Sequence, residues 1–384
     1  MKIAGHSAST WLKFAARMGQ SGIRRSKRVT KRALGVERSL RIIPYRGFGN
    51  GRTAIASGRV LESRPIREPL LHDPWYVNLR HAYRHFTSDV VSACPVAAHF
   101  AQLERAGASD EDGYFHFRFE GLDAREIDGG WQPVEFVTQV DRDPHPARAM
   151  GQVMIPPRSS TFGVISDMDD TVIQSNVTDF LKIARLTLFQ NARTRKPFEG
   201  VAAFYRALRG GEDGTRSNPI FYVSSSTWNL YELFRVFLEH NQLPSGPILL
   251  RDMGIDEDKF IVDPGHGHKS HKIDAILAMY PRLRFILVGD SGQDDPFIYR
   301  EAVWRHPGRI LAIYIRDIRS QRREIVKEIA QELSAEGIPT LLVPTTTEAA
   351  LHAAEQGWIS GETLTEIRSD QRADEALGKT TPSI

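Results

Sequence analysis

The chain has 384 residues, of which 41% are hydrophobic and 25% charged, a composition typical of a globular protein with room for two domains. Its single cysteine, Cys94, excludes an internal disulfide framework, and no apolar run approaches the roughly 18 residues that a transmembrane helix needs. The net charge of +3 is unevenly distributed, because residues 1–46 contain 12 Lys or Arg and one acid, which leaves −8 for the remainder.

Residues 1–40 form a basic N-terminal segment that lacks the apolar core of a secretory signal. Its composition favours a disordered tail. The alternative is a peripheral anchor, since each Lys or Arg near an anionic bilayer contributes about 1 kcal/mol to binding. The same charge would attract nucleic acid, but no aromatic-basic readout motif accompanies it, so we expect no specific nucleic-acid binding. We expect a cytoplasmic protein, to which the anchor interpretation adds a peripheral contact with membranes.

Residues 41–157 are predicted to form a β-rich domain. Phe115, Phe117 and Phe119 alternate with polar residues, which places the three rings on one face of a strand. Further short strands are expected at 59–62 and 133–137. Short strands of this kind predict a β-sandwich-like domain.

Residues 158–355 alternate between apolar strand patterns and helical patterns, and residues 356–384 are assigned to a C-terminal tail. The expected strands are 162–166, 219–224, 284–289, 309–315 and 340–343. The expected helices are 177–190, 198–209, 229–240, 271–280, 295–304 and 320–335. This alternation predicts an α/β fold with a Rossmann-like parallel sheet that helices cover on both faces. Ligands of such sheets bind at the C-terminal ends of the strands.

The first of these strands ends in two carboxylates. Asp167 and Asp169 are two residues apart in extended backbone, so their side chains point to the same side. Two acids placed in this way repel each other unless a cation lies between them or one is protonated. The pair therefore indicates either a chemical site or a turn with an acidic face.

Other strand ends of the same sheet carry complementary groups. Ser224 lies at the end of the strand expected at 219–224, Asp290 follows the strand expected at 284–289, and Lys269 and Lys272 come shortly before the latter strand. Each group alone is weak evidence, because acids and serines are common in turns. Together they suit phosphoryl transfer, in which a carboxylate attacks phosphorus, a second acid moves the proton, and a hydroxyl and an ammonium hold the phosphoryl oxygens. A hard divalent cation, by default Mg²⁺, would let acids and phosphate share this volume.

These residues resemble the four motifs of the haloacid dehalogenase superfamily of phosphatases, including its DxDxT motif at 167–171. The resemblance is greater to one branch, the actin-patch-associated phosphatidate phosphatase family, which is related to the lipin catalytic domain. That similarity is carried by residues 222–231, 271–272 and 288–296, with 185–189 and 313–316 in support. It covers about 160–355 strongly and the β-rich part more loosely, and it leaves out residues 1–40. The resemblance implies a haloacid dehalogenase type of sheet.

The resemblance also implies roles for single residues. Asp167 would be the nucleophile and Asp169 the acid and base. Ser224 and Lys272 would bind the phosphate. Lys269 is the alternative lysine, and we prefer Lys272 because it opens the apolar helical pattern that follows it.

The metal ligands implied by the resemblance are Asp167, Asp169 through its backbone carbonyl, Asp290 and Asp295. Asp294 stands where the family often has a basic residue, so the choice between Asp294 and Asp295 stays open. The cofactor implied is Mg²⁺.

The family implies a Mg-dependent phosphatidate phosphatase that produces diacylglycerol and phosphate through an aspartyl-phosphate intermediate. One alternative is a phosphatase of the same type that acts on a soluble or nucleic-acid phosphomonoester, and another is a non-catalytic membrane adaptor. The helix at 177–190 is apolar over much of its surface, which suits either a core helix or a lipid-facing wall of the site. The acyl specificity, the oligomeric state and the role of the β-rich part do not follow from the sequence.

Overall fold

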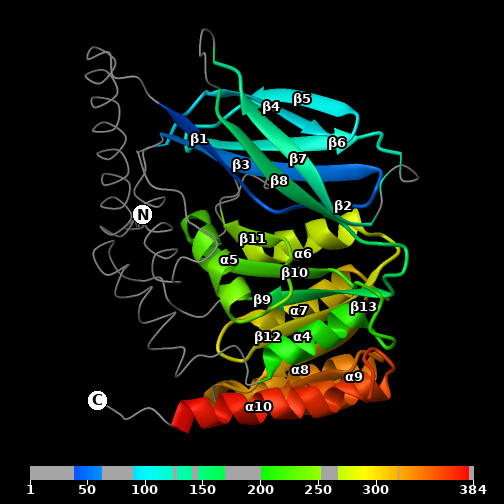
Figure 1. The fold of residues 1–384 in the computed structure, drawn as a ribbon. Coiled ribbons are helices and arrows are strands. Elements are labelled where there is room, and N and C mark those ends of the chain that lie inside the picture. Colours follow the sequence, from blue (N-terminus) through cyan, green and yellow to red (C-terminus); the bar gives the residue numbers. More distant parts are fainter. Residues whose placement is uncertain are drawn as a thin grey trace, which may run out of the picture. The chain divides into compact units, whose positions relative to one another are not determined.

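The computed structural model describes residues 39–62, 90–123, 127, 129–140, 146–168, 200–251, 267–318 and 320–379. The described residues from Leu40 onward belong to one compact unit. They form two sheets, one from the N-terminal part of the unit and one from the part that follows it (Figure 1). The predicted basic segment, residues 1–40, lies outside the described residues except for its last two positions.

The N-terminal sheet has eight strands. They are β1 (Leu40–Pro44), β2 (Gly47–Gly49), β3 (Thr53–Glu62), β4 (Pro95–Phe100), β5 (Leu103–Ala108), β6 (Tyr114–Glu120), β7 (Gly130–Thr138) and β8 (Arg148–Ile155). The order is β1-β3-β2-β8-β7-β4-β5, and β6 also pairs with β3. All pairs are antiparallel except β2 with β8. The β-rich character predicted for residues 41–157 is thus present, while the sandwich arrangement stays a prediction.

The apolar face predicted for β6 is confirmed. Phe115, Phe117 and Phe119 are all buried, and Phe115 and Phe117 both lie against the ring of Phe136 on β7. Strand alternation puts every second residue into the core, so the three rings contribute to one hydrophobic cluster.

The second sheet has six strands, all parallel. They are β9 (Phe162–Asp167), β10 (Ile220–Thr227), β11 (Ile248–Arg251), β12 (Arg284–Asp290), β13 (Ile310–Arg316) and β14 (Thr340–Val343), in the order β11-β10-β9-β12-β13-β14. The predicted α/β fold with a parallel sheet is confirmed. The edge strand β11, which has four residues, was not predicted.

Helices connect these strands. They are α4 (Val201–Gly210), η3 (Trp228–Leu230), α5 (Tyr231–His240), α6 (Gly267–Met279), α7 (Asp295–Arg305), η4 (Ser320–Arg322), α8 (Arg323–Ala335), α9 (Thr346–Glu355) and α10 (Thr363–Lys379). Within the described ranges, none of the helices is both long and apolar enough to cross a bilayer. The helix predicted at 177–190 lies outside the described residues.

The parallel sheet is buried on both faces, as its continuous apolar strands require. Val164 and Ile165 are neighbours on the central strand β9, yet they belong to different hydrophobic clusters. The Val164 cluster includes residues of α4, α9 and α10, and the Ile165 cluster includes residues of α6, α7 and α8. The two clusters hold the strands in place, so that the ends of β9, β10 and β12 lie at one edge.

Part of the predicted C-terminal tail is a packed helix. Ile367 on α10 is fully buried in the core cluster that contains α4, and α10 carries Asp370, whose carboxylate accepts a hydrogen bond from the backbone of Ala203 at 3.2 Å. Residues 356–384 are polar overall, so the few apolar positions that pack this helix against α4 are not apparent from composition. Full burial of an Ile side chain contributes about 1.5–3 kcal/mol, which favours the ordered helix over a tail.

The two sheets share a core. Phe48 on β2 is buried and lies edge-on to Phe221 of β10, with ring centroids 5.7 Å apart, and it also contacts Tyr280. Asn50 donates a hydrogen bond to the carbonyl oxygen of Met279 on α6 at 2.8 Å. The boundary predicted at residue 157 falls between β8 and β9, and the division into separate domains stays a prediction.

Candidate active site

The candidate site lies at the carboxyl ends of three neighbouring strands. Asp167 ends β9, Asp290 ends β12 on one side of it, and β10 carries Ser224 on the other side. Asp167 is in register with Val223, the residue before Ser224. Because all these strands are parallel, their last residues meet at one edge of the sheet. The structure therefore brings together the groups that the sequence placed at separate strand ends.

Lys269 lies between two of the carboxylates. Its Nζ donates to Asp167 Oδ1 and to Asp295 Oδ1, both at 2.7 Å. The Lys269, Asp167 and Asp295 side chains are only 3%, 4% and 0% exposed. Ion pairs with so little solvent contact are strong, because water screens them poorly. Lys269 therefore offsets part of the negative charge in this cluster.

Asp295 reaches the site from the first turn of α7. Its Oδ2 accepts a hydrogen bond from the backbone N–H of Asp290 at 3.1 Å. This approach requires Gly289, because a Cβ at that position would lie 2.9 Å from the Asp295 Cβ. The glycine before Asp290 thus makes room for the second acid of the motif.

The side chain of Asp290 is fixed by the turn that follows β12. Its Oδ1 accepts hydrogen bonds from the backbone N–H groups of Gly292 at 2.6 Å and Gln293 at 3.2 Å. The next residue, Ser291, is fully buried, and its hydroxyl oxygen accepts a hydrogen bond from the backbone N–H of Ile318 at 2.9 Å. The turn therefore orients Asp290 and ties it to the segment after β13.

Asp294 and Asp295 have different environments although they are adjacent in sequence. Asp294 pairs with Arg322 at 3.0 Å, and both side chains are more than a third exposed. Asp295 points into the cluster with Asp167 and Lys269. This difference favours Asp295 over Asp294 as the acid that serves the site.

Ser224 is buried at a point where β10 becomes irregular. The pairing of β10 with β11 shifts between Val223 and Thr227, so the intervening residues form a bulge. Bulges near active sites re-aim side chains. The Ser224 hydroxyl oxygen accepts the backbone N–H of Ser226 at 2.9 Å, and its carbonyl oxygen accepts a hydrogen bond from Lys272 Nζ at 3.3 Å.

The two candidate lysines differ in their partners. Lys269, the alternative in the sequence, contacts Asp167, while the preferred Lys272 is buried and contacts the Ser224 backbone. The helix was predicted to start at residue 271, but α6 starts at Gly267. Its first turn therefore holds Lys269. Local sequence gives no clear signal for this lysine, because helix ends are weakly determined by local sequence.

Three carboxylates could hold a metal ion. Ligand oxygens of Asp167, Asp290 and Asp295 lie within 4.8 Å of one another. Oxygen donors of this kind suit a hard cation such as Mg²⁺, so the residues present fit the group that the sequence implies. The implied acid and base, Asp169, lies outside the described residues.

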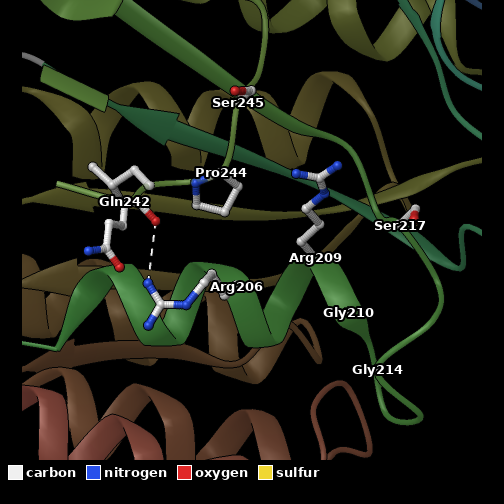
Figure 2. Close-up of a pocket in the computed structure, with 9 residues that line it drawn as sticks. Arg206, Arg209, Gly210, Gly214, Ser217, Gln242, Pro244 and Ser245 are labelled. Carbon is white, nitrogen blue, oxygen red and sulfur yellow. Dashed lines mark hydrogen bonds between the residues drawn. The ribbon is translucent and has the colours of Figure 1, made fainter. Parts of the chain in front are cut away.

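A pocket of about 410 Å³ lies elsewhere on the molecule. Figure 2 shows Arg206 and Arg209 of α4 lining it, with Arg206 donating to the backbone oxygen of Gln242 at 3.3 Å. Ser217 and Pro244, which also line it, precede β10 and β11. The pocket is thus at the amino-terminal edge of the sheet, opposite the carboxylate cluster, and is no part of the candidate site.

Comparison with known proteins finds a matching family model and similar curated proteins. Residues 162–317 match the family model described as "Phosphatidate phosphatase APP1, catalytic domain". The chain is 30% identical over 191 residues to Phosphatidate phosphatase APP1 of Saccharomyces cerevisiae, covering 48% of this chain and 32% of that protein. It is 32% identical over 170 residues to an uncharacterized protein of Schizosaccharomyces pombe, covering 43% of this chain and 26% of that protein.

The alignments therefore span about a third or less of these curated relatives. A solved carbohydrate acetylesterase from Xanthomonas citri aligns with 77% of this chain and 74% of that chain, at 12% identity and a TM-score of 0.24. A similarity this low supports no statement about fold or function. The match to the family model covers β9, β10 and β12 and hence Asp167, Ser224, Lys269, Asp290 and Asp295. Residues 162–317 of this chain are therefore similar to the catalytic domain of phosphatidate phosphatase APP1.

Proposed function

We propose that the protein is a Mg-dependent phosphatidate phosphatase with a sheet of the haloacid dehalogenase type. The observation that carries the proposal is the convergence of Lys269 and Asp295 on Asp167 at the end of β9. The proposed nucleophile, a lysine ammonium and a further acid thus lie at the carboxyl edge of the parallel sheet, where such sheets bind their ligands. The family match adds the substrate class, because the yeast relative is named a phosphatidate phosphatase.

The proposed reaction has two displacements at phosphorus. In the first, a carboxylate oxygen of Asp167 bonds to phosphorus while the bond between phosphorus and the diacylglycerol oxygen breaks, and Asp169 gives a proton to that oxygen. In the second, water attacks the phosphorus of the aspartyl phosphate and loses a proton to Asp169. The bond to Asp167 then breaks, which releases phosphate and restores the carboxylate.

The remaining groups hold the transferring phosphoryl group. The ammonium of Lys269 contacts Asp167, the proposed nucleophile. This contact supports Lys269 as the residue that binds a phosphoryl oxygen. The Ser224 hydroxyl, which the bulge of β10 aims, is the second proposed phosphate contact. Lys272, which contacts the Ser224 backbone, would position this serine.

Asp167, Asp290 and Asp295 are the proposed side-chain ligands of Mg²⁺. The family resemblance adds the backbone carbonyl of Asp169 to this proposal. When bound, the cation would offset the charge of the acids and of the phosphate. The turn that fixes Asp290 through two backbone N–H groups supports this role, because it holds the carboxylate before a cation binds.

A substrate panel tests the proposed function. Phosphate release is measured with phosphatidate in mixed micelles, glycerol 3-phosphate and p-nitrophenyl phosphate, each with Mg²⁺ or with EDTA. We expect Mg-dependent release that is fastest from phosphatidate. Faster turnover of the soluble esters would instead favour the alternative, a phosphatase of soluble phosphomonoesters.

An exposed apolar residue beside the site supports a lipid substrate. Ile318 follows β13 and is 44% exposed, while its side chain lies against the backbone at Gly292 in the Asp290 turn. Single exposed apolar residues are common, but this one lies next to a site proposed to bind a phosphate that carries acyl chains. We propose that Ile318 contacts the lipid surface.

Ile318→Asp tests that contact. Losing part of the burial free energy of an isoleucine, about 1.5–3 kcal/mol, should lower kcat/KM on vesicle phosphatidate about tenfold. Turnover of a monomeric short-chain phosphatidate should fall much less. Met150→Asp is the matched control, since Met150 on β8 is also exposed. Equal losses in both variants, or equal losses on both substrates, would argue against the contact.

A further inference from the structure

Arg59 joins the N-terminal sheet to the candidate site. It lies on β3 and is only 3% exposed. Its guanidinium carbon lies 3.1 Å from the ring centroid of Trp228 and 4.8 Å from that of Tyr114, and its Nε donates to the carbonyl oxygen of Asp112 at 2.7 Å. The rings of Tyr114 and Trp228 meet edge-on at 5.2 Å. Two aromatic rings and a backbone carbonyl thus surround the buried guanidinium of Arg59.

A buried guanidinium is costly unless its surroundings stabilise the charge. Burial lowers the pKa of Arg59 below its ordinary value, and the neighbouring Tyr114 and Tyr45 oppose that shift. The face of an indole ring attracts a desolvated cation strongly. The stack on Trp228 is therefore a main stabilising contact of this charge, and Arg59 in turn restrains the tryptophan.

Trp228 lies directly after the bulged segment that carries Ser224. The strand β10 ends at Thr227, and Trp228 begins η3. The upstream side of the bulge is held by sheet pairing at Val223. On the downstream side, Thr227 pairs with Arg251 and the next residue stacks on Arg59. The irregular segment is thus restrained at both ends by pairing within its own sheet, and at its downstream end also by the stack on Arg59 of the other sheet.

We propose that Arg59 is a positioning residue of the catalytic site, which holds Trp228 and thereby fixes the Ser224–Thr227 segment for phosphate binding. This gives the N-terminal sheet a role in the reaction. The proposal rests on the proposed function for its kinetic consequence, whereas the restraint on the segment can be measured without turnover.

Arg46 provides a matched control. It is also an arginine of the N-terminal sheet region that lies over a tryptophan, with its guanidinium carbon 5.7 Å from the Trp131 ring centroid. It pairs with Glu239 at 3.4 Å, near the end of α5 that is remote from Trp228. Arg46→Met therefore removes a stack within the N-terminal sheet and an ion pair to α5. It keeps the backbone N–H that donates to the Tyr231 hydroxyl at 2.7 Å.

The first experiment measures amide hydrogen exchange of residues 224–230 in the full chain. Arg59→Met should speed this exchange about tenfold, because the downstream end of the segment then keeps only the pairing of Thr227 with Arg251. Arg46→Met should leave the exchange unchanged. Arg59→Lys keeps the charge but loses the planar stack, so a smaller increase is expected. This variant decides the result if Arg59→Met does not fold. Unchanged exchange in a folded Arg59 variant would overturn the proposal.

The second experiment is a double-mutant cycle on phosphatidate turnover. In the wild-type background, Arg59→Met should lower kcat about 10- to 100-fold with little change in KM. In a background where Ser224 is already alanine, Arg59→Met should lower kcat less than about twofold. An equal loss in both backgrounds would show a merely structural role and overturn the proposal. If the wild-type chain releases no phosphate from phosphatidate, the proposed function fails, and the exchange measurement still decides the role of Arg59.

Discussion

Asp167→Asn is expected to lower kcat for Mg-dependent phosphate release by at least about 10⁴-fold, because an amide cannot form the aspartyl phosphate. The fold should survive, since Lys269 keeps its second partner, Asp295. The measurement is steady-state phosphate release together with the thermal unfolding midpoint of the same preparation. A variant with wild-type unfolding and substantial turnover would contradict the role of Asp167 as nucleophile.

The neighbouring acids of the last motif provide the control for this prediction. Asp294→Asn removes a charge that pairs with Arg322 at the surface, and exposed ion pairs contribute at most about 1 kcal/mol. It should therefore leave activity nearly unchanged. Asp295→Asn removes a fully buried carboxylate that contacts Lys269, so it should impair activity strongly. The reverse order of activity losses would assign the metal role to Asp294 instead of Asp295.

Lys269→Met is expected to lower kcat/KM by about 10²–10³-fold, the effect of removing one preorganised group that stabilises the transition-state charge. The substitution also leaves the carboxylates of Asp167 and Asp295 close together without the lysine ammonium that pairs with both of them. Breaking a buried ion pair in this way destabilises proteins by about 3–5 kcal/mol. Saturating Mg²⁺ should recover part of the thermal stability of this variant, because the cation offsets the same charge.

Lys272→Met separates the two lysines. Lys272 is buried and contacts the carbonyl oxygen of Ser224, so its loss should lower stability and reduce activity less than Lys269→Met does. Both variants are measured with the same substrate and Mg²⁺ concentration. If Lys272→Met shows the larger kinetic loss at equal stability, then Lys272 is the lysine that binds phosphate.

The parallel sheet was predictable from sequence because its strands are buried on both faces. Residues such as Val164 and Ile165 are both apolar, since each faces a separate helical layer. Continuous apolar runs of this kind stand out against amphipathic helices. The edge strand β11 gave a weaker signal, since only Ile248, Leu249 and Leu250 precede a charged residue.

The choice between neighbouring site residues depends on details that a sequence pattern does not hold. A helix start four residues earlier than expected moves Lys269 into the first turn of α6. Asp294 and Asp295 differ because one precedes α7 and the other lies in its first turn, against the space left by Gly289. Helix ends are weakly determined by local sequence, so these choices needed three-dimensional contacts.

The contact between the two sheets was also beyond sequence reasoning. Arg59 and Trp228 are far apart in the chain, and each alone reads as an ordinary residue of a strand or turn. Their stack, and the packing of Phe48 on Phe221, arise only when both sheets are folded. Whether a buried charge such as that of Arg59 is stabilised depends on long-range contacts of this kind, and local sequence patterns do not contain information about these contacts.

The most direct test is phosphate release from phosphatidate by the wild-type chain and by Asp167→Asn, each with Mg²⁺ and with EDTA. We predict release only by the wild-type chain with Mg²⁺, with diacylglycerol formed in equal amount. Release that persists in EDTA, or in Asp167→Asn, would contradict the proposed metal-dependent reaction at Asp167. The absence of any release by the folded wild-type chain with Mg²⁺ would contradict the proposed substrate.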